Sequence, residues 1–474
     1  MKINRFMIAA PKSGSGKTMI TCALLQLLKD NGKNVSSYKC GPDYIDPMFH
    51  KKVLGVPSKN LDTFFTDEKT TVQLFLDERA DGDFAVLEGL MGLYDGLGGI
   101  YEQGSSYHLA KVTQTPIILV VDAKGMGKSV LALIAGFLQY DTQHLIKGVL
   151  LNRMSKGYYD IIKPLIEKKL SVKVVGYFPE QKDIGLSSRY LGLVMPDELS
   201  DIKKQLNETA DRLKKTIDMD LLKDIAAEAD EIGDSENADV YNEKSIGNCD
   251  QNEFSQNKAI NTVNIAVAMD EAFCFYYEDN LRLLEKCGSK LQYFSPLHDT
   301  ELPDNCDALL LGGGYPELYA KELSENISMR KSIKTAFEAG LPTVAECGGF
   351  MYLHTYIHNQ NCVFDMAGVL DGWCHFKGKL VRFGYIELEE KNSNFLPSDE
   401  KIRAHEFHYY DSTDNGTDCI ATKPATGRKY DCVISRDNYW LGFPHIYYPS
   451  NPHFAENFVK KAQEYERNKN GKLL

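Results

Sequence analysis

Short apolar segments alternate with helical segments from residue 5 to about residue 195. Six runs read as strands, and many of them are apolar on both faces: FMIAA, VSSYK, FAVLEG, PIILVVDA, KGVLLN and KVVGYF. Buried parallel strands have this composition. The segment MITCALLQLLKDNGK, which lies between the first two runs, carries one apolar stripe and ends at Asn31-Gly32, as an amphipathic helix does. The alternation predicts an α/β fold with a doubly wound sheet.

A second alternating region runs from residue 261 to residue 474. Its strand-like segments lie in VNIAVAMDEAF, KLQYFS, ALLLGGGYPELYA and LPTVAECGG. Residues 200–260 are polar and acidic; their first half has helical character and their second half has the composition of a disordered linker. We therefore predict a first α/β domain at residues 1–195, a helical and acidic linker at 196–260, and a second doubly wound domain at 261–474.

Composition and charge exclude several classes of protein. A chain of 474 residues is too long for one ordinary core, and 43% hydrophobic with 25% charged residues fits a globular enzyme. The net charge of -12 argues against a nucleic-acid partner. No segment is long and apolar enough to span a bilayer, and the first residues lack signal-peptide features, so we expect a cytoplasmic protein without a membrane partner. The eleven cysteines form no CxxC pair, which argues against a disulfide framework.

The segment PKSGSGKT stands between the first strand and the first helix. It matches the pattern G-x-x-x-x-G-K-[ST] at Gly16, Lys17 and Thr18, with Pro11 in place of the first glycine. In such a loop backbone N–H groups wrap phosphates, the lysine reaches the terminal phosphates and the hydroxyl holds Mg²⁺. A turn that merely caps the helix is the alternative. We predict a site for ATP and Mg²⁺ formed by Ser13, Gly14, Ser15, Gly16, Lys17 and Thr18.

A mononucleotide fold also needs an acidic residue at the end of a neighbouring strand to hold the metal. Either Glu88 or Asp122 could serve, since each ends a predicted strand. The loop after Glu88 contributes Asp95, and the loop KCGPDYIDPMFH contributes Asp43 and Asp46. Any one of these acids could be a solvated turn residue, but ligands of doubly wound folds bind where the carboxyl ends of the strands meet. We expect the three acidic loops to converge there.

The second region contains a cysteine between a strand (PTVAE) and a helical segment (FMYLHTY). A tight turn between a strand and a helix exposes a nucleophile at the helix N-terminus, which lowers the pKa of a thiol. This pattern predicts a nucleophilic Cys347 rather than a buried structural cysteine. The N–H of Gly348 and the loop Gly312–Gly314, mainly Gly313 and Gly314, are expected to stabilise an oxyanion.

A catalytic cysteine needs a histidine base that is close in space but distant in sequence. Four histidines in the last part of the chain are candidates: His405, His408, His445 and His453. His405 and His408 alternate along a predicted strand, which suits a binding surface. Spacing alone does not choose among the four.

The ordered motifs of both regions resemble the cobyrinic acid a,c-diamide synthases, which are glutamine-dependent amidoligases of the corrin pathway. The matching segments are SGSGKT, KCGPDYIDPMFH, EGLMGLYDG, VVDAKGMGKSV, GVLLNRM, LGGGYPELYA, AECGGFMYL, RFGY, HEFHY and the closing H-x(6)-NP segment. Two positions depart from the usual pattern. Tyr190 stands where a histidine is common, and Tyr447 stands where the closing segment commonly carries a second histidine. Many glutaminases carry a glutamate at this position, two residues after the base, but this branch is not expected to do so.

The resemblance implies a dethiobiotin-synthetase-like P-loop domain and a class I glutamine amidotransferase domain. It implies Cys347 as the nucleophile and His445 as its base. Thr18, Glu88 and Asp43 are the metal ligands that it implies. The substrate-binding residues that we predict are Asp43, Tyr44, Asp46 and Asp95, from the acidic loops, together with His405 and His408 of the predicted strand and Arg382. Lys377 and Lys379, near Arg382, complete the densest patch of cations for a polycarboxylate, although each lysine could equally be a solvated surface charge.

The expected reaction is amidation of the a and c acetate side chains of cobyrinic acid, with ammonia from glutamine and an acyl phosphate made from ATP. The expected partners are therefore glutamine and a tetrapyrrole polycarboxylate; a homodimer stays open. Three alternatives remain: the same chemistry on nickel-sirohydrochlorin, amidation of other positions as by cobyric acid synthase, and a dimeric P-loop ATPase switch with an inert glutaminase-like domain. Lys12, where related ATPases carry a lysine that reaches across a dimer, is the one residue in favour of the switch.

Overall fold

The computed structural model describes residues 3–77, 84–181, 199–232, 262–359 and 362–471. The chain divides into two compact units, Met1–Ser235 and Glu236–Leu474. Tyr190 and the acidic second half of the predicted linker lie outside the described residues. None of the helices in the described ranges has the length and hydropathy needed to cross a bilayer.

The N-terminal unit is built on a seven-stranded parallel sheet of order β3-β2-β4-β1-β5-β6-β7. Its strands are β1 (Arg5–Ala9), β2 (Val35–Cys40), β3 (Ser58–Leu61), β4 (Phe84–Glu88), β5 (Ile117–Asp122), β6 (Ile146–Asn152) and β7 (Lys173–Phe178). Strands β2, β3 and β4 lie on one side of β1, and β5, β6 and β7 lie on the other side. The sheet is therefore doubly wound, as predicted. The polar edge strand β3 is the one strand of this sheet that the apolar runs do not indicate.

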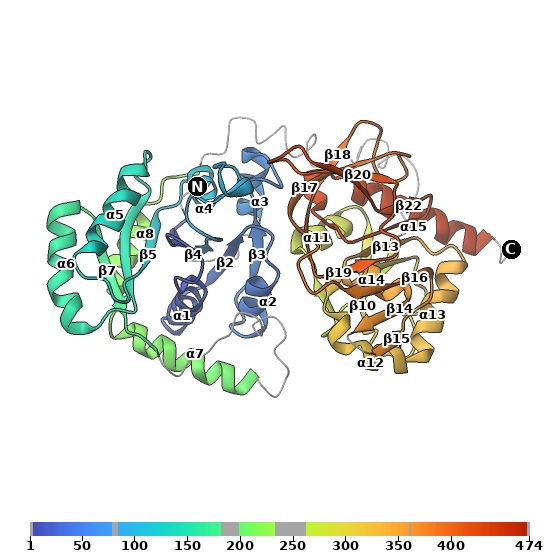
Figure 1. The fold of residues 1–474 in the computed structure, drawn as a ribbon, viewed down its shortest axis with the longest axis horizontal. Helices are drawn as coiled ribbons and strands as arrows, with labels where there is room; N and C mark the ends of the chain where they lie inside the picture. The colour runs from blue at the N-terminus through green and yellow to red at the C-terminus, as the bar shows by residue number, and fades with distance from the viewer. Residues whose placement is uncertain (1–2, 78–83, 182–198, 233–261, 360–361, 472–474) are drawn as a thin grey trace. The chain divides into compact units, whose positions relative to one another are not determined.

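Helices cover both faces of this sheet (Figure 1). Phe6 and Ile8 of β1 face a core shared with α1 (Lys17–Asp30) and α2 (Ile45–Lys52). Met7 and Ala9 face the opposite core, which is closed by α3 (Glu68–Asp77), α4 (Ser106–Val112), α5 (Ser129–Tyr140) and α6 (Lys156–Leu170). A short 3₁₀ turn, η1 (Leu97–Gly99), precedes α4. The alternation of β1 side chains between two cores explains why this strand is apolar throughout.

The helical part of the predicted linker packs within the N-terminal unit. It forms α7 (Leu199–Lys214) and α8 (Met219–Ala227). Leu206, Leu213 and Ile225 are buried in the same core as α1, and α7 lies alongside α1 (Figure 1). This stretch is polar overall but carries a narrow apolar stripe. The predicted domain boundary at residue 195 therefore lies before two helices that contribute to the hydrophobic core of the N-terminal unit.

The C-terminal unit is built on a six-stranded sheet of order β10-β8-β11-β13-β23-β22. Its strands are β8 (Val263–Ala268), β10 (Ser289–Phe294), β11 (Ala308–Leu311), β13 (Thr343–Glu346), β22 (Ile434–Arg436) and β23 (Tyr439–Gly442). The pairs are parallel except β22 with β23. The predicted doubly wound fold is thus present in both units.

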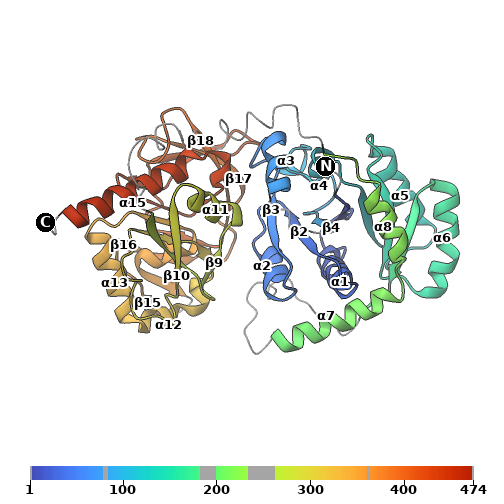
Figure 2. The same cartoon turned by 180° about the vertical axis from the view of Figure 1, so that it is seen from behind.

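Helices α11 (Glu278–Lys286) and α15 (His453–Gly471) pack together on one face of this sheet (Figure 2). The other face is covered by α12 (Ala320–Glu325), α13 (Ile327–Glu338) and α14 (Gly348–Leu353). Two 3₁₀ turns, η2 (Pro316–Tyr319) and η3 (Tyr448–Ser450), complete the helical elements described in this unit.

Three smaller sheets surround the central one. A pair of short strands, β9 (Phe273–Phe275) and β12 (Gly313–Gly314), is antiparallel. A four-stranded sheet contains β15 (Cys362–Asp365), β14 (His354–Asn359), β16 (Leu370–Phe376) and β19 (Tyr410–Ser412). A five-stranded sheet contains β21 (Lys429–Cys432), β20 (Cys419–Thr422), β17 (Arg382–Glu390), β18 (Lys401–His408) and β24 (His445–Ile446).

The prediction of a helix over FMYLHTY is only partly correct. Helix α14 ends at Leu353, and His354 begins β14. Thr355 and Ile357 are β-branched, a property that favours a strand, and β14 pairs with both β15 and β16. Tertiary pairing therefore ends the helix one turn early.

Candidate active sites

The predicted phosphate loop joins β1 to α1. Gly14 (φ 74°) and Gly16 (φ 89°) adopt left-handed conformations, and a Cβ on Gly16 would lie 2.4 Å from Asn152 Nδ2. Asn152 also donates a hydrogen bond to the Ser15 carbonyl at 2.8 Å. Ser13 and Gly14 are exposed, whereas Lys17 is buried. The loop thus presents the N-terminus of α1 as a site for an anion.

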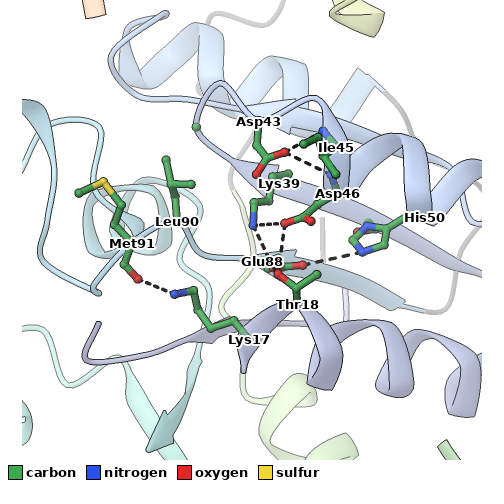
Figure 3. Close-up of polar contacts among 12 residues, drawn as sticks. Lys17, Thr18, Lys39, Asp43, Ile45, Asp46, His50, Glu88, Leu90 and Met91 are labelled. Carbon is green, nitrogen blue, oxygen red and sulfur yellow. Dashed lines mark hydrogen bonds and ion pairs between the residues drawn. The ribbon is translucent and has the colours of Figure 1, made fainter. Parts of the chain in front are cut away.

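Lys17 extends from this loop toward the segment that follows β4. Its Nζ donates to the Met91 carbonyl at 2.5 Å (Figure 3). Burial, together with the nearby Lys39 ammonium, lowers the pKa of Lys17 to about 8. A bound phosphate that accepted a hydrogen bond from the Lys17 ammonium would replace the Met91 carbonyl as its acceptor.

Two carboxylates and a lysine meet behind the loop (Figure 3). Lys39 Nζ lies 2.5 Å from Asp46 Oδ2 and 2.9 Å from Glu88 Oε1. The Thr18 hydroxyl donates to Glu88 Oε1 at 2.7 Å and lies 3.4 Å from Asp46 Oδ2. His50 Nε2 lies 3.8 Å from Glu88 Oε2, an oxygen that accepts no hydrogen bond from the described residues. These residues come from β2, α2, β4 and α1, so two of the three acidic segments, those of Asp46 and Glu88, converge.

Burial and the neighbouring charges together set the pKa values in this cluster. Burial acts to lower the pKa of Lys39, but Asp46 and Glu88 raise it well above its usual range. Burial raises the pKa of Glu88 to about 7, although Lys39 opposes the shift. Burial acts to raise the pKa of Asp46 as well, but Lys39 outweighs it and the pKa is lowered. Lys39 therefore holds two carboxylates together that would otherwise repel each other.

The donors around Thr18 suit a magnesium ion. A hydroxyl and carboxylate oxygens are the ligands that Mg²⁺ prefers, and it usually takes few protein ligands besides phosphates and water. Thr18, Glu88 and Asp46 supply such oxygens within hydrogen-bonding distance of one another. In the described part of the chain, no three His, Cys, Asp or Glu side chains form a metal site by themselves.

Asp43 and Asp95, the other predicted acids of these loops, accept hydrogen bonds from nearby backbone N–H groups. Asp43 Oδ1 accepts the N–H groups of Ile45 and Asp46 at 2.8 and 3.2 Å, and burial raises the pKa of Asp43 to about 6. Tyr44 is buried beside it. Asp95 accepts the Gly92 N–H at 2.9 Å.

Asp122, the alternative to Glu88 as metal ligand, is held elsewhere. Arg153 Nε donates to Asp122 Oδ1 at 2.7 Å, and its Nη2 contacts Oδ2. The Thr18 hydroxyl contacts Glu88 instead. Lys12 is exposed on the phosphate loop.

In the C-terminal unit, Cys347 stands between β13 and α14 with φ 46° and ψ -101°. A positive φ at a residue with a side chain is strained, and such strain occurs at nucleophile elbows. The elbow is held on both sides: Cys347 N donates to the Gly442 carbonyl at 2.8 Å, and Gly349 N donates to the Gly312 carbonyl at 2.9 Å. The predicted turn is therefore present.

The glycine loop packs against both the elbow and His445. A Cβ on Gly313 would lie 2.3 Å from His445 Cε1, and a Cβ on Gly348 would lie 3.0 Å from Gly314 N. The loop thus brings Gly313, Gly314, Gly348 and His445 into one place. The backbone N–H groups of the loop and the elbow can serve as oxyanion donors there.

Of the four candidate histidines, His445 is the one beside the glycine loop. His405 lies opposite His445 in the β18–β24 pair, and His408 stacks on Phe443 at 4.0 Å while its Nδ1 contacts the Tyr410 carbonyl at 2.6 Å. His453 contacts Glu400 at 2.8 Å on the surface. Burial, assisted by His408, lowers the pKa of His445 to about 3, so its imidazole is neutral and can accept a proton.

The expectation of a lowered thiol pKa is wrong for the protein alone. Burial, together with the Glu317 carboxylate, raises the pKa of Cys347 well above its usual range. Helix α14 has only six residues, and its dipole does not outweigh the loss of solvation. The thiol is therefore protonated and needs a base.

Two of the three cations in the predicted patch form ion pairs with carboxylates of the protein. Arg382 Nη1 lies 3.4 Å from Glu406 Oε1, and its guanidinium stacks over the Tyr430 ring at 4.1 Å. Lys377 Nζ lies 3.8 Å from Asp411 Oδ2, and Lys379 is exposed.

Two residues of these sites were not among the sequence-based candidates. Lys39 could have been suspected, because it is the one charged residue in β2, a strand that is buried throughout. Glu346, whose Oε2 lies 3.9 Å from His445 Nδ1, directly precedes the nucleophile but is separated from the base by nearly a hundred residues. No local pattern marks that contact.

Two family models match the two units. Residues 6–191 match the CobQ/CobB/MinD/ParA nucleotide binding domain, and residues 264–451 match the CobB/CobQ-like glutamine amidotransferase domain. A P-loop domain followed by a cysteine-elbow amidotransferase domain defines the chain as an amide-forming ligase that contains a glutamine amidotransferase.

Similar proteins narrow the class to one family. The cobyrinate a,c-diamide synthase of Caldanaerobacter subterraneus subsp. tengcongensis is 37% identical over 98% of this chain and 99% of that protein. Those of Listeria innocua and Clostridium tetani are each 36% identical, over 95% and 96% of this chain and 97% and 99% of those proteins. The chain belongs to the cobyrinate a,c-diamide synthase family. Among solved structures, PurLQS from Thermotoga maritima is 18% identical with a TM-score of 0.30, over 44% of this chain and 99% of that chain.

Proposed function

We propose that this protein amidates the a and c acetate side chains of cobyrinic acid, using ATP and ammonia released from glutamine. The observation that carries the proposal is the pairing, in one chain, of the Thr18–Glu88–Lys39 cluster behind a phosphate loop with the Cys347 elbow beside His445. Similarity over almost the full chain to cobyrinate a,c-diamide synthases supports the choice of substrate.

Glutamine hydrolysis begins at Cys347. His445 takes the thiol proton, and the sulfur attacks the carboxamide carbon, whose oxygen is stabilised by N–H groups of Gly313, Gly314 and Gly348. The C–N bond then breaks, and His445 returns the proton to the nitrogen. The products are ammonia and a thioester, which water hydrolyses to glutamate. The high thiol pKa makes proton transfer to His445 a required part of this step.

Activation of the carboxylate uses the N-terminal unit. A carboxylate reacts poorly with ammonia because hydroxide is a poor leaving group. Transfer of the γ-phosphoryl group of ATP to a carboxylate oxygen gives an acyl phosphate, from which phosphate leaves readily. The Lys17 ammonium and the loop N–H groups would bind the phosphates. Magnesium would neutralise phosphate charge here, held by Thr18, by Glu88 and by a third carboxylate. That carboxylate would be Asp46, which contacts Thr18, or the predicted ligand Asp43, which would have to exchange its backbone N–H contacts for the metal.

The proposal includes substrate-binding residues in each unit: Asp43, Tyr44, Asp46 and Asp95 in the N-terminal unit, and Arg382, His405 and His408 in the C-terminal unit. His405 and His408 are buried and have lowered pKa values because of burial, so they would act as neutral hydrogen-bonding groups. Arg382 would have to exchange its Glu406 contact for a substrate carboxylate. Assembly as a homodimer stays a prediction.

Product analysis tests the proposed function. The protein is incubated with ATP, Mg²⁺, glutamine and either cobyrinic acid or nickel-sirohydrochlorin, and amides are counted by mass spectrometry. We expect two amides on cobyrinic acid. Amidation of nickel-sirohydrochlorin alone would favour the nickel-sirohydrochlorin a,c-diamidation alternative. Amides at other positions of the corrin would favour a cobyric acid synthase. ATP hydrolysis without any amide would favour the ATPase switch.

A further inference from the structure

The base His445 has a carboxylate neighbour from the elbow itself. Glu346 Oε2 lies 3.9 Å from His445 Nδ1, and both side chains are almost fully buried, at 7% and 4% exposure. The contact follows from the fold: β23 pairs with β13, where Glu346 lies opposite Gly442, and the chain then turns to place His445 three residues later. A carboxylate at Nδ1 leaves Nε2 of the imidazole for the proton of the thiol.

The residue two positions after the base does not fill this role. Tyr447 stands there, and its hydroxyl donates to Asp279 Oδ2 at 2.7 Å, away from the imidazole. We propose that Glu346 is the positioning residue of His445: once the two side chains close from 3.9 Å to hydrogen-bonding distance, Glu346 accepts the Nδ1 proton, fixes the tautomer with a free Nε2, and stabilises the imidazolium that forms when Cys347 loses its proton. This inference rests on the proposed role of Cys347 and His445.

The ionisation of Glu346 can be followed in a pH profile, because few of the neighbouring groups have a pKa close to that of Glu346. Burial raises the pKa of Glu346 to about 8, although the Ile446 N–H, 3.4 Å from Oε1, acts to lower it. The other titratable groups near the pair are Cys347, Glu317, His405, His408, Tyr276 and Tyr448. Of these, only Glu317 has a comparable pKa, raised by burial to about 7. Glutamine hydrolysis should increase as pH rises through about 8, because the ionised carboxylate stabilises the imidazolium.

The test is the pH profile of glutamate formation from glutamine, between about pH 6 and 9. Glu346→Gln keeps an oxygen acceptor for the Ile446 N–H but cannot ionise. We expect it to lower kcat by about 10- to 100-fold, to change KM less than about threefold, and to abolish the rise in activity with pH. Glu346→Asp should retain the rise at reduced kcat. Amidation with free ammonia should be unchanged in both variants.

Two matched variants separate this role from a structural one. Glu317→Gln should keep the rise with pH; if that variant loses it while Glu346→Gln keeps it, Glu346 is not the group involved. Glu390 is an equally buried carboxylate that accepts the N–H groups of Phe395 and Leu396 at 2.8 and 2.9 Å, so Glu390→Gln controls for loss of a buried charge and should leave the profile unchanged.

The outcomes are distinguishable. A wild-type profile that is flat between pH 6 and 9 overturns the inference even if the variants fail to fold, and so does a Glu346→Gln enzyme with wild-type kcat and profile. Glutamine hydrolysis that survives Cys347→Ala would instead overturn the proposed function on which the inference rests.

Discussion

Lys39 is the residue on which the geometry of the N-terminal site depends most. Its side chain is 3% exposed and contacts two carboxylates that are themselves buried. Removing one partner of such a cluster leaves an uncompensated buried charge, which costs far more than an exposed pair is worth. The lysine therefore stabilises the unit and holds Glu88 next to the Thr18 hydroxyl.

Replacement of Lys39 by methionine should destabilise the N-terminal unit by about 3 kcal/mol or more, measured by urea unfolding. Ammonia-dependent amidation should fall at least about tenfold, because Asp46 and Glu88 would separate or take up protons, whereas glutamine hydrolysis should continue. Lys163→Met is the matched control: its 3.9 Å contact with Glu167 lies on the surface of α6, so the cost should stay below about 0.5 kcal/mol. An unfolding midpoint for Lys39→Met equal to that of the control would contradict this role.

At the scale of elements, the two-residue strand β12 controls the second site. It consists of Gly313 and Gly314, and a Cβ on Gly313 would lie within 2.3 Å of the His445 ring. That distance is far below van der Waals contact, so the ring or the loop must shift.

A Gly313→Ala variant should therefore lose about 100-fold in glutamine hydrolysis, measured as glutamate release, and should retain amidation with ammonia. Gly136→Ala is its control, because a Cβ at Gly136 in α5 meets no atom within 4 Å. Full glutaminase activity in Gly313→Ala would mean that His445 is not the base or that the loop does not contact it.

Sequence patterns predicted the elements whose folding is decided locally. The β1 strand, the stripe of α1 and the elbow at Cys347 are marked by periodicity, glycines and spacing within about fifteen residues, and all are present. The polar strand β3 and the change from α14 to β14 at His354 depend on pairing partners far along the chain. The contacts of Lys39 with Glu88 and of Glu346 with His445 escaped prediction for the same reason. Such residues meet only once the strand order is known.

At the scale of the whole molecule, the proposed function assigns one half-reaction to each unit. The N-terminal unit, including α7 and α8 in its core, holds the phosphate loop and the acidic cluster. The C-terminal unit holds the thiol, the base and the glycine loop. In the proposed mechanism, ammonia freed by one half-reaction must react with the acyl phosphate of the other before water does, which would account for the presence of both units in one chain.

Transfer of nitrogen from the glutamine amide to the macrocycle is the most direct test of this coupling. The wild-type protein and Cys347→Ala are each given ATP, Mg²⁺, cobyrinic acid, glutamine labelled with ¹⁵N in its amide, and unlabelled ammonium, and the product is analysed by mass spectrometry. Wild type should place ¹⁵N at both new amides, and Cys347→Ala should make the same diamide with unlabelled nitrogen only. A ¹⁵N-labelled diamide from Cys347→Ala, or no diamide from wild type with either nitrogen source, would contradict the assignment of the two half-reactions.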